Sequence, residues 1–380
     1  MNIDQHLSKK TFYEIMLKDR KKGKLPIEIL GDIFHEENKK ELADLANIRF
    51  AQGELYFHYQ DYEAAIFKWE SITNELGPWA RKNVGDAYFE LDLFSTAIET
   101  YKSIATDHNL LKTEIALKLF QIYVEEEKQE LATQFIKEAV ELNPDYPKVT
   151  KIARYFFEQN NDFPNAIDLA INEGLRTEDV HWFDTLIKYI DEGKSHLHEP
   201  AFFYSALEVL YSVDSVRFEK MVIALWNQYK CDKKYVHWLE TINDIVESVE
   251  VSKSTAWDHV SGLYFEAFKD SLVGKMELDD TIRFMPKFLE NWMRITKSTQ
   301  AIWAYTAILT WNEFYPSVIQ DEMLERAKQG IWTCASNQDI LQDCLQLFQD
   351  MMKWASINNI EIGAKVRWLV QEIMDLSYTN

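Results

Sequence analysis

Glycine and proline are both scarce in this 380-residue chain, which has 11 glycines and 8 prolines. Folds made of many short strands need these residues in their turns, so their scarcity argues against a β sandwich or barrel. No run of about 18 uncharged apolar residues occurs, and the first residues lack the apolar stretch of a signal peptide. We therefore expect an all-α, cytoplasmic protein that does not span a membrane.

Cysteine and basic charge are also in short supply. Cys231, Cys334 and Cys344 are an odd number without a CxxC pair, which indicates reduced thiols that behave as small buried hydrophobic residues. The chain has 41 Lys and Arg residues against 62 Asp and Glu residues, for a formal net charge of −21. Neutralising phosphates needs clustered basic residues, so we expect no nucleic-acid partner and favour a basic protein or peptide.

Signatures of catalysis are missing as well. Lys275 comes nearest to the lysine of a phosphate-binding loop, but Met276 stands where Ser or Thr must bind magnesium. His196, His198 and Glu199 could offer metal ligands, yet no second cluster at zinc-ligand spacing accompanies them. There is no HExxH helix and no GxSxG turn. We expect no enzymatic activity, no cofactor and no metal.

What the chain does have is a pattern in its first quarter that occurs twice, at an offset of 32 residues. Each copy contains Gly-x-x-Tyr, followed by an alanine and, four positions later, a large aromatic residue. The two sets are Gly53, Tyr56, Ala65 and Trp69, and Gly85, Tyr88, Ala97 and Tyr101.

This pattern resembles the tetratricopeptide repeat (TPR), a helix pair of about 34 residues. One pair cannot bury its own apolar face, so such units stack on one another. We expect the glycines to let the backbones of paired helices approach closely, and the tyrosines to fill gaps left by the alanines. The resemblance implies a right-handed α-solenoid of TPR helical hairpins, which continues into divergent helical repeats.

The pattern divides the chain into three regions. Residues 1–42 form N-terminal basic or capping helices, whose lysines either touch an anionic surface or remain solvated. Residues 43–175 hold the TPR-like repeats, and residues 176–380 a divergent α-helical repeat region with Gly193–Pro200 as its most loop-like segment. The four repeats cover about 43–77, 78–111, 112–146 and 147–175.

Most of the tryptophans lie in the divergent region. They could line a groove for a ligand. The alternative, which we favour, is that large rings fill wide seams between helices where the packing of rings against small residues has been lost.

The resemblance also implies a binding surface, because the first helix of each TPR pair faces the concave side. Glu54 and Glu114 would repel the carboxylate of a chaperone tail, which argues against that familiar TPR ligand. We expect an acidic, aromatic surface that binds a basic or amphipathic protein segment. The candidate partner-binding residues are Asn47, Phe50, Glu54, Phe57, Trp79, Asp86, Phe89, Glu90, Gln121 and Glu125.

We therefore expect a non-enzymatic scaffold for a protein or peptide partner. One alternative is the partner-binding N-terminal region of a larger or multi-component enzyme, because the last residues, 376–380, form no polar capping helix. A second alternative is a peptide-sensing bacterial regulator. Against this, residues 1–42 are too short for the DNA-binding domain that precedes the repeats in such proteins.

Overall fold

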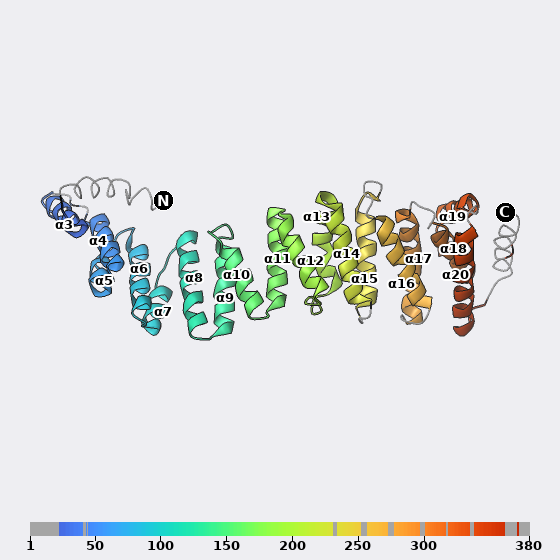
Figure 1. The fold of residues 1–380 in the computed structure, drawn as a ribbon, viewed down its shortest axis with the longest axis horizontal. Coiled ribbons are helices and arrows are strands. Elements are labelled where there is room, and N and C mark those ends of the chain that lie inside the picture. The colour runs from blue at the N-terminus through green and yellow to red at the C-terminus, as the bar shows by residue number, and fades with distance from the viewer. Residues whose placement is uncertain are drawn as a thin grey trace. The chain divides into compact units, whose positions relative to one another are not determined.

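The computed structural model describes residues 23–40, 43, 45–230, 234–251, 257–272, 277–296, 301–316, 318–334, 338–361 and 371. Every regular element within these ranges is a helix, which confirms the all-α prediction for the described chain (Figure 1). None of these helices combines the length and the apolar character needed to cross a membrane. Most of the basic N-terminal segment, Cys231, Lys275 and the last nine residues lie outside the described ranges.

Contacts between Cα atoms divide the chain into two compact units, unit 1 (Met1–Asn160) and unit 2 (Asn161–Asn380). The described helices of unit 1 pack in sequence order, with α4 on α5, α5 on α6, α6 on α7, and α8 on α9. Three hairpins, α4/α5, α6/α7 and α8/α9, occupy the first three predicted repeats. The helices are α3 (Pro26–Glu37), α4 (Ala46–His58), α5 (Tyr62–Glu70), α6 (Gly77–Glu90), α7 (Phe94–Lys102), α8 (Asn109–Glu125), α9 (Gln129–Leu142) and α10 (Val149–Gln159).

In the first two hairpins, an aromatic ring of the second helix lies against a glycine of the first. A Cβ atom on Gly53 would stand 2.3 Å from Nε1 of Trp69, and one on Gly85 would stand 2.6 Å from Cε1 of Tyr101. The Trp69 indole also donates a hydrogen bond to the carbonyl of Phe50 at 3.1 Å. The glycines therefore make room for a ring, whereas the sequence led us to expect that they make room for helix backbone.

The alanines of the repeated pattern lie in the seams, as predicted. Ala65 and Ala97 are both 0% exposed. Tyr56 and Tyr88 are half-buried and pack against the core cluster that contains Ala65. In the first two hairpins, a ring of the second helix therefore lies against a glycine of the first, and the alanine of the second helix is fully buried.

The turn inside each hairpin has a left-handed residue that is not glycine. In all three turns, the amide of the next residue donates to a carbonyl five positions back, at 2.9 to 3.0 Å, as in a Schellman motif. The second helix then begins at once. Glycine is the usual residue at this left-handed position, but here the position is occupied by polar residues. The sequence therefore did not reveal these turns. The left-handed residues are Gln60, Asp92 and Glu127, with φ angles of 63°, 58° and 56°.

The fourth predicted repeat is divided between the units, since α10 belongs to unit 1 and α11 to unit 2.

In unit 2, each helix from α11 to α15 packs on the helix two places further along the chain. One row is α11 on α13, α13 on α15, and α15 on α17; the other is α12 on α14 and α14 on α16. Two such rows are the arrangement expected for stacked helical hairpins. The elements are α11 (Phe163–Thr177), α12 (Val180–Asp191), η1 (Pro200–Phe203), α13 (Tyr204–Val213), α14 (Ser215–Tyr229), α15 (Tyr235–Ser248), α16 (Trp257–Leu272), α17 (Leu278–Ile295), α18 (Ala301–Phe314), α19 (Asp321–Cys334) and α20 (Gln338–Ile357).

Tryptophan rings fill the seams of unit 2, which confirms the second of the two interpretations for the residues concerned. The Trp257 indole donates to the hydroxyl of Tyr211, and the Trp292 indole donates to Oγ of Ser261, both at 3.2 Å. Their polar edges are therefore satisfied inside the seams. The buried tryptophans of unit 2 are Trp226, Trp238, Trp257, Trp292, Trp311 and Trp354.

The loop-like segment Gly193–Pro200 lies inside unit 2. The ammonium group of Lys234 donates to the carbonyls of His196 and His198 at 3.2 and 3.0 Å, and the hydroxyl of Tyr229 donates to the His198 carbonyl at 2.9 Å. The loop is thus held to its own unit by side chains of α14 and of the residue before α15. Cys344 in α20 is a buried free thiol, as predicted.

We predict that Gly53→Ala destabilises unit 1. The added methyl group collides with the Trp69 ring, and overpacking of this kind costs about 1–3 kcal/mol. Gly31→Ala in α3 is the matched control, because a Cβ atom there has no neighbour within 4 Å. Urea unfolding followed by circular dichroism should show a lower midpoint for the first variant and an equal or higher midpoint for the second. Equal midpoints would contradict the ring-against-glycine seam.

Candidate partner-binding site

The ten candidate residues all lie on the first helices of the hairpins in unit 1, and α6 packs directly against α8. The structure places them at three levels of exposure. Phe50 and Phe89 are buried; Asn47, Phe57, Trp79 and Asp86 are partly buried; and Glu54, Glu90, Gln121 and Glu125 are exposed.

Phe50 and Phe89 belong to the core, since only 3% and 8% of their surfaces are exposed. The Phe50 ring packs on Trp69 with 6.4 Å between centroids, and the Phe89 ring packs on Phe94 at 5.6 Å. The Lys118 ammonium lies 5.0 Å from the centre of the Phe89 ring. Both phenylalanines therefore support the surface from below, which corrects the expectation that they face a partner.

Two other rings are exposed only in part. Phe57 packs edge-on against Tyr62 at 5.2 Å, and Trp79 packs edge-on against His108 at 6.3 Å. Each ring is held in one orientation by its neighbour, so little side-chain entropy remains to be lost when another molecule binds. Phe57 and Trp79 are thus the apolar part of the candidate surface.

Asp86 belongs to a network of half-buried charges that the sequence analysis did not find. The Lys82 ammonium lies 2.8 Å from Asp86 and 3.0 Å from Glu114, and the three side chains are 13%, 14% and 24% exposed. The hydroxyl of Tyr101 donates to the Asp86 carboxylate at 2.6 Å, and that of Tyr146 donates to Glu114 at 3.2 Å. The spacing of four between Lys82 and Asp86 was the only signal in the sequence, because Glu114 and the tyrosines come from other segments.

The network raises the pKa values of Lys82 and Tyr101. Burial alone would lower the pKa of Lys82, but the carboxylates of Asp86 and Glu114 outweigh burial and raise it. Burial and the Asp86 carboxylate raise the pKa of Tyr101 well above its usual value. Lys82 is therefore charged at neutral pH and neutralises part of the acidic surface that the sequence led us to expect.

Glu90 and Glu125 have a feature in common, since they are the last residues of α6 and α8. The C-terminus of a helix carries partial negative charge, so a carboxylate there is unfavourable by about 0.3–1 kcal/mol. Neither helix has a basic residue in its last turn, whereas α4 ends with His58. Two adjacent helices therefore present exposed carboxylates at ends that favour a cation.

The described residues contain no group of three or more His, Cys, Asp and Glu side chains placed to hold a metal. The possible ligands of the loop before η1 point to other partners. Nε2 of His198 lies 3.5 Å from Asp168, and the Glu199 carboxylate lies 3.2 Å from the Lys234 ammonium.

No protein-family model and no curated protein matches this chain. Among solved structures, it is similar to the C-terminal part of a TPR repeat-containing protein from Cytophaga hutchinsonii, with 17% identity and a TM-score of 0.28, over 74% of this chain and 99% of that one. It is also similar to a chain in the structure of Naa15/Naa10 bound to HypK-THB, with 12% identity and a TM-score of 0.23, over 95% of this chain and 66% of that one.

We predict that Lys82→Met strongly destabilises unit 1. It leaves the carboxylates of Asp86 and Glu114 close together without their cation, and breaking a buried ion pair from one side costs about 3 kcal/mol. Lys39→Met is the control, because its ion pair with Glu36 is exposed and should contribute little. Urea midpoints measured at pH 7 test this. A loss no larger than that of the control would show that the network does not stabilise the fold.

We predict that stability falls at alkaline pH and that Tyr101→Phe reduces the fall. The raised pKa of Tyr101 means that its contribution is complete below its unfolded pKa of about 10 and is lost as the pH rises further. Above that pH, removing one such tyrosine should lower the slope of stability against pH by up to about 1.4 kcal/mol per unit. Tyr59→Phe changes an exposed ring and should keep the wild-type slope. Denaturant unfolding between pH 8 and 11.5 provides the measurement.

Proposed function

We propose that this protein is a non-enzymatic scaffold, and that α4, α6 and α8 of unit 1 bind a basic or amphipathic segment of a protein partner. The observation that supports this most directly is the pair of exposed carboxylates, Glu90 and Glu125, at the C-terminal ends of adjacent helices. A lysine or arginine of the partner would relieve an unfavourable interaction that each carboxylate has with its own helix.

Apolar contacts would come from the partly exposed rings of Phe57 and Trp79, which their neighbours hold in place. Exposed Glu54 adds a third carboxylate on α4, and exposed Gln121 adds an amide on α8 that can bond to a peptide backbone. A segment with basic residues on one side and apolar residues on the other fits this combination.

Asp86 is one of the candidate residues that we do not assign to partner binding. Asp86 is engaged by Lys82 and Tyr101, so its carboxylate is not assigned to the partner. The acidic part of the surface is formed by Glu54, Glu90 and Glu125. The proposal that the scaffold is non-enzymatic rests on the sequence, which has no recognisable catalytic motif.

The test is capture of peptides from an immobilised library of 15-residue sequences that vary the number and spacing of Lys, Arg and Leu. We predict that the wild-type protein retains peptides rich in Lys or Arg together with Leu. Retention should fall as the salt concentration rises from 0.05 to 0.5 M, because the Debye length becomes about threefold shorter and screens the charges. The variant with Glu90→Gln and Glu125→Gln should lose this enrichment.

The matched control carries Glu99→Gln and Glu138→Gln, which make the same charge change at exposed positions on the second helices α7 and α9. It should retain the same peptides as the wild-type protein. If both double variants behave alike, α6 and α8 are not the binding surface. If the wild-type protein retains acidic and basic peptides equally, the proposed class of partner is wrong.

A further inference from the structure

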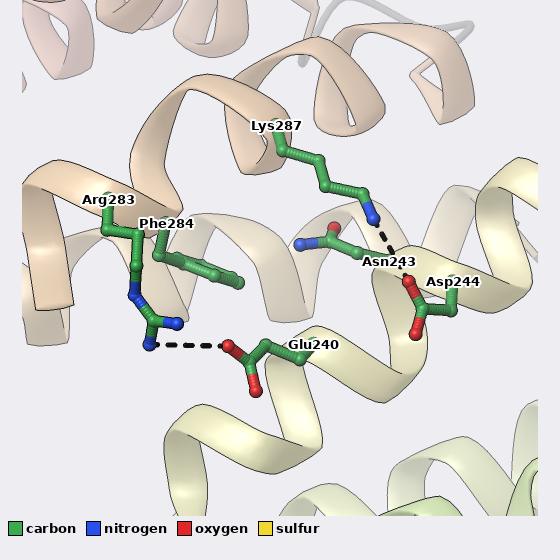
Figure 2. Close-up of a pocket in the computed structure, with 6 residues that line it drawn as sticks. All are labelled: Glu240, Asn243, Asp244, Arg283, Phe284 and Lys287. Atoms are coloured by element: carbon green, nitrogen blue, oxygen red, sulfur yellow. Dashed lines mark hydrogen bonds and ion pairs between the residues drawn. The ribbon is translucent and has the colours of Figure 1, made fainter.

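A pocket of about 300 Å³ lies between α15 and α17 of unit 2, far along the chain from the surface discussed above. Its lining combines four charged residues, one amide and one ring, three from each helix (Figure 2). They are Glu240, Asn243 and Asp244 from α15, and Arg283, Phe284 and Lys287 from α17.

Two ion pairs connect the helices and bound the pocket. The Arg283 guanidinium lies 3.4 Å from the Glu240 carboxylate, and the Lys287 ammonium lies 3.0 Å from Asp244. Glu240 and Asp244 are separated by one helical turn, so the two pairs stand one turn apart with the pocket between them (Figure 2). All four side chains are more than a third exposed, so another charged group can compete for them at low cost.

Asn243 lies between these pairs, and neither N–H group of its side-chain amide is used. Its side chain is 1% exposed, and its Oδ1 accepts a hydrogen bond from the hydroxyl of Tyr264 at 2.7 Å. Its Nδ2 is buried without any hydrogen-bond partner. Leaving a buried donor unsatisfied is unfavourable. Figure 2 shows this nitrogen directed toward the space beside Phe284.

The charges around the pocket are predominantly negative. Asp280 lies 3.2 Å from Arg283, and Glu247 lies 3.3 Å from Lys287. With Glu240 and Asp244, four carboxylates therefore surround two cations. A ligand that carries a positive charge would be favoured over a negative one.

We propose that this pocket binds a lysine or arginine side chain of an extended peptide segment. A backbone carbonyl of that segment accepts the free hydrogen bond from Nδ2 of Asn243, and the aliphatic part of the basic side chain lies against Phe284. Its cationic end pairs with Glu240 or Asp244, whose carboxylates keep oxygen atoms beyond those in the ion pairs. A free cation would leave Asn243 unsatisfied, whereas a peptide supplies both the carbonyl and the charge. This second site does not depend on whether α4, α6 and α8 bind a partner.

The experiment titrates the full chain with three blocked tripeptides, acetyl-Ala-Lys-Ala-amide, acetyl-Ala-Arg-Ala-amide and acetyl-Ala-Glu-Ala-amide. Nuclear magnetic resonance of ¹⁵N-labelled side-chain amides follows the two protons on Nδ2 of Asn243. We expect the Lys and Arg peptides to shift these signals in a saturable way and the Glu peptide to leave them unchanged. Equal shifts with the acidic peptide, or no shift with the basic peptides, would overturn the proposal.

A pair of variants separates charge recognition from general changes of the chain. Glu240→Gln with Asp244→Asn removes two carboxylates from the pocket and should weaken binding of the Lys peptide by about fivefold or more. Asp321→Asn with Glu325→Gln makes the same charge change at exposed positions of α19 and should leave the affinity unchanged. Unchanged affinity in the first variant would show that the pocket carboxylates do not recognise the cation.

Discussion

The contact between a glycine on one helix and a large ring on the next holds the first hairpins together. At Gly53 and Gly85, no atom could replace the missing side chain without displacing the ring of Trp69 or Tyr101. Because that contact sets the separation of the paired helices, it also sets which faces of α4 and α6 are buried. The exposed positions of Glu54 and Glu90 on these two helices follow from that packing.

The same ring contact connects the core to the polar surface. Tyr101 fills the space beside Gly85, and its hydroxyl holds the carboxylate of Asp86, which in turn pairs with Lys82. One side chain therefore serves both the apolar seam and the charged network above it. A change in the core of the second hairpin would be transmitted to the candidate surface through this hydrogen bond.

The two units share one packing device and differ in another. In both, a glycine makes room for a ring, as Gly53 does for Trp69 in unit 1 and Gly330 does for Tyr305 in unit 2. In unit 2, buried tryptophans also fill the seams, and the indoles of Trp257 and Trp292 donate hydrogen bonds inside them. Large rings allow wider and less regular seams. The pocket beside Asn243 lies between α15 and α17 of that unit, where two ion pairs cross from one helix to the other.

The sequence by itself determined the helical class and the first three hairpins, because large rings and small residues at a fixed spacing predict which helices pair. It could not show the non-glycine turns at Gln60 and Asp92, since their conformation is imposed by hydrogen bonds from neighbouring backbone. Only the tertiary structure decided that Phe50 and Phe89 are core residues and that the charge of Asp86 is already paired. Burial and ion pairing arise between segments distant in the chain, and no local pattern of residues encodes how close those segments come.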